Sequence, residues 1–353
     1  MSDQRQDVGD GALAVQGGRD VRVYQGMTSQ DVKTIINELS EKMLLPAYTQ
    51  AARVEVERRM EEFQAKVLQR FEADATARIE AFAEPDFQAT VIAAQRAHAR
   101  SGDEGVRDVL VDLIARRSGI AQRSRLSLSL NQAVEAAAAL TQEEFAALSL
   151  CYLVKYTQFN ATSYQALVAY IKKHYVPFIA EVPAESSVFQ YLEAQGCAGH
   201  GFVAVGLSDV LKTNYAGLLS DGAPESAYVG ATDEGTVAIW RGSQLLMPCL
   251  HNPDLLQLGA LNRDVFNKAA AARKLDQAVA DKLWAVFEPT IWNANTMPMK
   301  LAKDVPEIQR LFEVWTKSGL GNATLTSVGI AIAHASISGR TEGFDADLAI
   351  WIK

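Results

Sequence analysis

The sequence contains few cysteines, and these are far apart. Cys151, Cys197 and Cys249 are odd in number and include no Cys-x-x-Cys pair, so neither a disulfide framework nor a cysteine-rich zinc site is expected. The five histidines are also isolated, without the His-x-x-x-His spacing that places two ligands on one helix face. The sequence therefore predicts no metal, no cofactor and a reducing compartment.

The chain also lacks a long apolar run and a secretory signal. Its first residues, MSDQRQDVGDG, have neither the basic nor the apolar region of a signal peptide. The most apolar stretch, residues 325–337, contains His334 and serines, and it is shorter than the roughly 20 residues that cross a bilayer. We therefore expect a soluble cytoplasmic protein, and the sequence argues against a membrane partner.

The sequence contains fewer basic than acidic residues. The chain has 34 Lys and Arg against 42 Asp and Glu, which gives a formal net charge of -8. A protein that mainly coats nucleic acid would be basic, so this balance argues against nucleic acid as the principal partner. The 48% hydrophobic and 22% charged fractions are those of a folded protein, and 353 residues leave room for two or three domains.

The front of the chain is a glycine-rich leader, residues 9–26, with the sequence GDGALAVQGGRDVRVYQG. Apolar and polar residues alternate on both sides of a glycine pair, which is typical of short β-strands joined by a turn. An isolated two-stranded ribbon buries too little apolar area to be stable in water. Copies from several chains would pair their edges, so we predict a homo-oligomer assembled through Leu13, Val15, Val21 and Val23. A disordered tail is the alternative.

A long helical region follows the leader. A hydroxyl and an acid, Thr28 and Asp31, form a capping-box pattern that predicts a helix start. After Leu45-Pro46, apolar residues recur every three or four positions as far as about Phe82, which indicates a second, amphipathic helix resembling a coiled coil, roughly 55 Å long. The spacing of the apolar residues is compatible with two arrangements: pairing with the same helix of another subunit, or packing within the same chain. The predicted seam includes Val56, Met60, Phe63 and Val67.

Residues 85–200 have the spacing of a helical bundle. Pro85 and the Ser101-Gly102 pair separate helical segments, and a second capping-box pattern begins at Thr141. In the last third, glycine and aromatic residues become frequent, and a turn at residues 241–244 predicts a β-hairpin of residues 235–240 and 245–250. The chain should end in a docked strand at 347–352, because an exposed Trp351 and Ile352 would favour aggregation.

The predicted fold is mainly α. It is a helical bundle with a long amphipathic helix, a short N-terminal β leader and an α+β C-terminal region. The expected units are the leader, a helical stalk, a helical bundle and an α+β module, over residues 1–27, 28–84, 85–200 and 201–353.

Four arginines surround a predicted linker at residues 118–129; they are Arg116, Arg117, Arg123 and Arg125. In an acidic protein, such a cluster is a candidate contact for phosphates or an acidic partner. A solvated loop is the alternative, since no aromatic residues are interleaved to stack bases.

Cys197 and His200 are the closest approach to a reactive pair. A neighbouring base can convert a thiol into a thiolate nucleophile, but a spacing of three residues does not establish such a dyad, and no third orienting residue follows from the sequence. A structural cysteine and histidine in a glycine-rich turn is the alternative.

The two ends of the chain resemble one family. The leader GDGALAVQGGRDVRVYQGMTSQDV is similar to the front of uncharacterised bacterial proteins, some of them encoded in or near defence and conflict systems. The terminal LTSVGIAIAHASISG followed by DLAIWI resembles the closing motif of one such family. The resemblance implies no catalytic residue.

These observations favour a self-assembling cytoplasmic bacterial protein that acts as a non-enzymatic scaffold, sensor or effector, with a role in phage defence. Its partners would be further copies of itself and a phage or host protein. Two alternatives stay open. One is a hydrolase or transferase using Cys197 and His200, and the other is nucleic-acid binding through Arg116 to Arg125.

Overall fold

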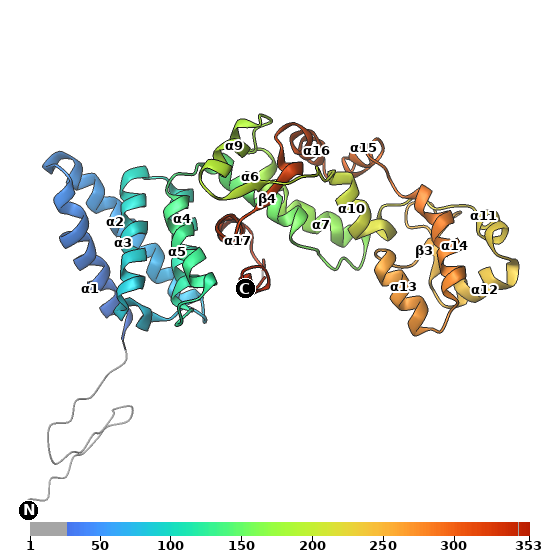
Figure 1. Cartoon of the computed structure of the whole chain (residues 1–353), viewed down its shortest axis with the longest axis horizontal. Helices are drawn as coiled ribbons and strands as arrows, with labels where there is room; N and C mark the ends of the chain where they lie inside the picture. Colours follow the sequence, from blue (N-terminus) through green and yellow to red (C-terminus); the bar gives the residue numbers. More distant parts are fainter. Residues whose placement is uncertain (1–26, 345) are drawn as a thin grey trace, which may run out of the picture.

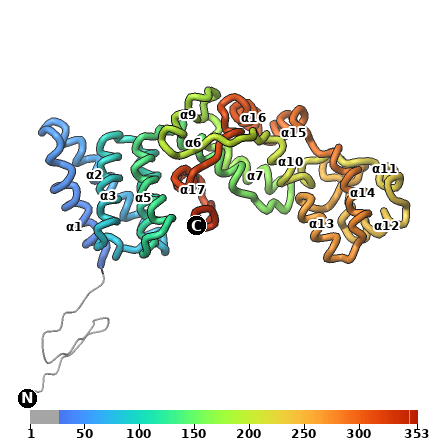
Figure 2. Tube along the Cα trace, in the orientation of Figure 1, coloured from blue at the N-terminus to red at the C-terminus, as the bar shows by residue number. Residues whose placement is uncertain are grey.

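The computed structural model describes residues 27–344 and 346–353. Within them the prediction of a mainly α protein is confirmed, with 17 α-helices and two small antiparallel sheets of two strands each. The molecule is elongated, with an N-terminal bundle at one end, a central body, and a lobe of residues 216–291 at the other end (Figure 1). Figure 2 shows that the C-terminus returns to lie near the N-terminal bundle.

The N-terminal bundle consists of α1 (Ser29–Leu39), α2 (Gln50–Ala73), α3 (Pro85–Ser101), α4 (Glu104–Ser118) and α5 (Arg125–Ala137). A π-helical turn, η1 (Ser40–Leu44), and a 3-10 turn, η2 (Leu45–Ala47), connect α1 to α2. The capping box that the sequence predicts at Thr28 and Asp31 is present. The predicted linker is shorter than expected, because Ser124 caps α5 and the helix begins at Arg125.

The prediction of one helix reaching Phe82 is wrong. α2 ends at Ala73, and its 24 residues span about 36 Å. The Asp74 carboxylate accepts hydrogen bonds from the backbone N–H and the hydroxyl of Thr76, at 2.9 and 2.7 Å. Such a side-chain turn competes with helical hydrogen bonding, and the chain continues as the 3-10 helix η3 (Ile79–Ala83).

The apolar seam of α2 packs within its own chain, against α3 and α4. Val56, Met60, Phe63 and Val67 are at most 6% exposed and belong to the main core. The segment expected as a stalk, residues 28–84, therefore lies in the same bundle as α3 to α5. In this fold the four seam residues are covered without a second subunit.

The central body comprises α6 (Gln142–Lys155), α7 (Tyr164–His174), α8 (Val176–Ile179), α9 (Ser187–Ala194), α10 (Leu207–Tyr215), α15 (Met297–Leu301), α16 (Ile308–Lys317) and α17 (Ser327–Arg340). β1 (Ala198–His200) pairs antiparallel with β4 (Ala323–Leu325), which follows the 3-10 helix η6 (Leu320–Asn322). α17 packs against α4, α5 and α6 and is buried from Val328 to Ile337. It therefore joins the central body to the N-terminal bundle.

The outer lobe has its own core. Its elements are η4 (Ala216–Leu218), α11 (Glu225–Ala231), α12 (Glu234–Gly242), β2 (Leu246–Pro248), β3 (Leu256–Leu258), α13 (Arg263–Ala272), α14 (Gln277–Phe287) and η5 (Glu288–Thr290). Tyr228, Trp240, Phe266 and Trp284 lie at the centre of this core. The chain enters and leaves the lobe side by side, where the Trp292 N–H donates to the Leu219 carbonyl at 2.8 Å.

The predicted hairpin of residues 235–240 and 245–250 is wrong. Its first half is helix α12, because the Asp233 carboxylate accepts the Thr236 N–H at 2.8 Å and caps a helix start. β2 pairs instead with β3, and Leu246 lies opposite Leu258.

The predicted C-terminal strand is also wrong, although the segment is docked. Asp347 caps a short 3-10 helix, η7 (Leu348–Ile350), by accepting the Ala349 N–H at 2.9 Å. Ile352 is only 3% exposed. Within the described residues, no helix combines the length and the apolar character needed to span a membrane.

Candidate functional site

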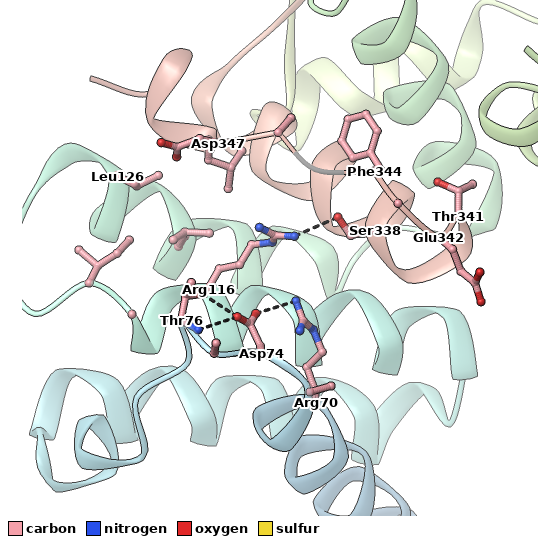
Figure 3. Close-up of a pocket in the computed structure, with 18 residues that line it drawn as sticks. Arg70, Asp74, Thr76, Arg116, Leu126, Ser338, Thr341, Glu342, Phe344 and Asp347 are labelled. Carbon is pink, nitrogen blue, oxygen red and sulfur yellow. Dashed lines mark hydrogen bonds and ion pairs between the residues drawn. The ribbon is translucent and has the colours of Figure 1, made fainter. Parts of the chain in front are cut away.

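An open pocket of about 850 Å³ lies between the N-terminal bundle and the C-terminal residues (Figure 3). The last turns of α2 and α4 and the beginning of α5 form one side. The end of α17, residues 341–344 and residues 346–348 supply the other side. Its volume is within the range of small-molecule sites, which commonly lie between packed elements. The pocket is therefore the candidate functional site.

Two arginines share one buried carboxylate beneath this pocket. The Asp112 side chain on α4 is 5% exposed. It accepts hydrogen bonds from Nη2 of Arg70 at 2.8 Å and from Nε of Arg116 at 2.6 Å. A buried carboxylate without a partner is strongly destabilising, so this arrangement keeps both guanidinium groups on Asp112.

Asp74 extends the network toward the end of α2. Its carboxylate lies 2.9 Å from Nη2 of Arg70 and also accepts the two hydrogen bonds from Thr76. Burial by itself raises the pKa of Asp74, but the Thr76 hydrogen bonds and the charges of Arg70 and Arg116 outweigh that effect and lower the pKa below its usual value. Asp74 is therefore ionised at neutral pH.

Arg116 connects the bundle to α17. Its Nη2 donates to Oγ of Ser338 at 2.9 Å, across the middle of the pocket (Figure 3). Ser338 Oγ lies 3.4 Å from Nδ1 of His334, and Nε2 of His334 lies 2.6 Å from the carbonyl O of Ala346. Because a carbonyl only accepts, these contacts assign the proton of a neutral imidazole to Nε2 and leave Nδ1 as the acceptor.

His334 is neutral at physiological pH. Burial, with a further contribution from the Arg116 charge, lowers its pKa to about 4. A chain of hydrogen bonds thus runs from Asp112 through Arg116, Ser338 and His334 to Ala346, and it links α4 to the C-terminal residues.

The structure separates the predicted arginine cluster. Arg116 lines the pocket, whereas Arg117 is 5% exposed and forms an ion pair with Asp86. Arg123 and Arg125 are exposed. Two of the four arginines are therefore engaged inside the chain, and the exposed basic surface is correspondingly small.

The structure does not bring Cys197 and His200 into a reactive pair. Cys197 is fully buried, and burial raises the pKa of its thiol to about 12. Its Sγ donates to the Gln195 carbonyl at 3.7 Å, while His200 is 66% exposed and lies 3.7 Å from Glu193. In the part of the chain that the structure describes, no hydrogen bond joins the two side chains. The thiol is therefore protonated at neutral pH.

The other predicted site residues are the oligomerisation residues. Leu13, Val15, Val21 and Val23 lie outside the described residues, and the four residues of the α2 seam are in the core. Among residues 27–344 and 346–353, no group of three or more His, Cys, Asp or Glu side chains is placed to hold a metal ion.

Sequence reasoning missed Arg70, Asp112 and Ser338. A local signal exists for the first two, since Arg70 precedes Asp74 by four positions and Asp112 precedes Arg116 by four, the spacing of ion pairs on one helix face. The sequence contains no comparable signal that α17 places Ser338 beside Arg116.

The comparison with known proteins identifies a family but assigns no activity to it. No curated protein and no solved structure matches the chain. A family model with the bare description ":-like" matches residues 26–352, and so includes both sides of the pocket. The chain therefore belongs to this uncharacterised family.

Proposed function

We propose that this chain is a self-assembling, non-enzymatic bacterial sensor in which the pocket binds a small molecule. The observation that carries the proposal is the 2.9 Å hydrogen bond between Arg116 and Ser338, which joins α4 to α17 across 222 positions of sequence. A ligand in the pocket would contact both helices, and it would favour the arrangement of the two that it binds more tightly.

The pairing of the polar groups supports binding rather than catalysis. Asp112 is held by two arginines, and His334 is held between Ser338 and Ala346. Nucleophilic catalysis requires a nucleophile beside an available base. Of the titratable side chains described near the pocket, His334 is the natural base, but burial lowers its pKa to about 4, so it is a weak proton acceptor at neutral pH.

Self-assembly is proposed from the alternating sequence of the leader. Because the α2 seam is covered within the chain, the proposal assigns assembly to residues 1–26. All three cysteines are free and buried, which supports a reducing location such as the bacterial cytoplasm.

The proposed role is antiviral defence, with a phage or host protein as a further partner. Its support is the resemblance of both chain ends to proteins encoded in or near defence systems. In this proposal the assembled particle carries one pocket in each subunit, and occupancy of the pocket sets its state.

The test is a phage panel. Cells carry the gene, a variant lacking residues 1–26, Ser338→Ala, Ser226→Ala or the empty vector. Ser226 is exposed on α11 and does not line the pocket, so Ser226→Ala is the matched control. The parent and Ser226→Ala should restrict some phages, whereas the truncation and Ser338→Ala should lose protection at equal protein levels. If cells with the gene resist no better than cells with the vector, the defence role is refuted.

Neither alternative function has a specific observation in its favour. The Cys197 thiol lacks an adjacent base, and Arg117 is buried against Asp86. Both remain distinguishable by experiment, through Cys197→Ala and His200→Ala in any activity assay, and through the salt dependence of nucleic-acid binding.

A further inference from the structure

The charges around the pocket are unevenly distributed. Two arginines and three acids line it, namely Arg70, Arg116, Asp74, Glu342 and Asp347. Asp112 lies beneath them and brings the acids to four. The described lining, taken with Asp112, is therefore net negative.

The two arginines are not free to take an anion. Arg70 and Arg116 both bind Asp112, whose side chain is 5% exposed. An anionic ligand would have to compete with Asp112 for the guanidinium groups, and a buried carboxylate that loses its partners is strongly destabilising. The arginines therefore neutralise the floor of the pocket and give little attraction for phosphate or carboxylate ligands.

Two acids at the rim are not engaged in an ion pair of this kind. Glu342 and Asp347 are exposed, and neither forms an ion pair with any residue that the structure describes. Figure 3 shows them on opposite sides of Arg116. The uncompensated charge of the pocket is thus at its rim, where a ligand would enter.

The ends of the surrounding helices add to this negative potential. The last turns of α2, α4 and α17 all contribute lining residues, whereas α5 and the short η7 contribute their first residues. The C-terminal end of a helix carries a partial negative charge and favours cations. Three such ends against two N-terminal ends, one of them the short η7, therefore favour a positively charged ligand.

One wall of the pocket is apolar. Ile120, Leu126, Leu130 and Leu348 line it, and the half-buried Ile120 and Leu126 present most of its surface. A fully hydrated inorganic ion would gain nothing from this wall. An organic cation would place hydrocarbon against it.

We infer that the pocket binds a small organic cation, an amine or guanidine attached to an apolar body. The cationic group lies toward Asp347, which directly precedes Leu348, and the apolar body lies on the wall formed by α5 and Leu348. This inference rests on the proposed sensor function and names the ligand class of the same pocket.

The test compares three compounds with the same apolar body and different charge, by isothermal titration calorimetry on the full chain. Phenethylamine is the cation, phenethyl alcohol the neutral analogue and phenylpropionate the anion. The cation should bind up to about fivefold more tightly than the alcohol, as expected for one solvent-exposed charge contact, and the anion more weakly than the alcohol.

The matched variants are Glu342→Gln with Asp347→Asn, and Glu57→Gln with Glu61→Gln. Both pairs change the net charge equally, but Glu57 and Glu61 are exposed on α2 away from the pocket. Asparagine can still cap η7. The first pair should bring the cation to the affinity of the alcohol, and the second should leave the preference unchanged.

Equal or tighter binding of the anion, absence of binding by the cation, or a preference that survives the rim substitutions would overturn the inference. None of these results depends on assembly or phage restriction. If Ser338→Ala still abolishes phage protection, the pocket binds a ligand of another class. Failure of the cation inference is therefore distinguishable from failure of the proposed sensor function.

Discussion

The indole Nε1 of Trp351 donates to the backbone carbonyl of Tyr156 at 3.1 Å, although 195 positions of sequence separate the two residues. The Trp351 ring also meets the Tyr152 ring edge to face, with centroids 5.1 Å apart. This contact fixes the end of the chain on α6 and holds η7, which carries Leu348 into the pocket wall.

Trp351→Ala should destabilise the fold by about 1–3 kcal/mol, which is less than a fully buried tryptophan would cost because the side chain is only partly buried. Urea unfolding measures this. Ile350→Ala is the control, since Ile350 is 60% exposed and its truncation should change stability by less than about 0.5 kcal/mol. Equal effects of the two substitutions would contradict docking through Trp351.

Asp112→Asn should destabilise the protein by about 3–5 kcal/mol, because it leaves Arg116 without a carboxylate partner and Arg70 with Asp74 alone. Asp108→Asn is the matched change on the same helix. Asp108 also contacts cations, but its side chain is 32% exposed, so the expected cost is at most about 1 kcal/mol. Chemical denaturation of both variants decides whether the network beneath the pocket contributes to stability.

Stability should fall as the pH is lowered from about 6.5 to 4. His334 has a pKa lowered from 6.5 to about 4 by burial and by the Arg116 charge, so the unfolded chain binds the proton first. The contribution of His334 to the free energy of unfolding is complete above its pKa in the unfolded chain. It falls progressively below that pKa, by a total of about 3 kcal/mol near pH 4.

His98 and His174 also have pKa values lowered by burial and act in the same direction. The specific measurement is therefore the difference in unfolding free energy between pH 7 and pH 5 for the parent and for His334→Asn. A smaller difference in the variant is expected. If the difference is unchanged, His334 takes up no proton on unfolding between pH 7 and pH 5.

The native mass of the full chain should exceed that of one subunit, and a variant lacking residues 1–26 should be monomeric. The reason is that the α2 seam is covered within the chain, which leaves the leader to carry assembly. Light scattering coupled to size exclusion measures both masses. If the truncated chain stays oligomeric, the interface lies on the part of the chain that the structure describes. If both proteins are monomeric, self-assembly is not part of the function.

The three cysteines should resist a thiol-specific reagent at pH 7 in the folded protein and react once it is unfolded. All three are buried, and burial raises the pKa of Cys151 and of Cys197 to about 12. A fast-reacting Cys197 in the folded chain, lost in Cys197→Ala, would instead support the cysteine-dependent enzyme.

Local sequence determined the helices and where several of them begin. The capping boxes at Thr28 and at Thr141 are formed by residues three apart, and the apolar spacing of α2 describes a face that must be buried. These features depend on neighbours within one or two turns, so they can be predicted from a short window. The wrong predictions are also local, since the turn residues 241–244 suggested a hairpin, whereas Asp233 caps a helix over the segment that precedes them.

Tertiary structure alone decided what the seam of α2 contacts and where the site lies. Helical spacing is the same for a face that meets another subunit and one that meets α3 and α4, so it cannot select between them. The sequence grouped Arg116 with the arginines that lie near it along the chain. In the structure, its hydrogen-bond partners are Asp112 on α4 and Ser338 on α17. Only the return of the C-terminal helix to the first bundle brings those groups together, because contacts across 222 positions depend on the packing of the whole core.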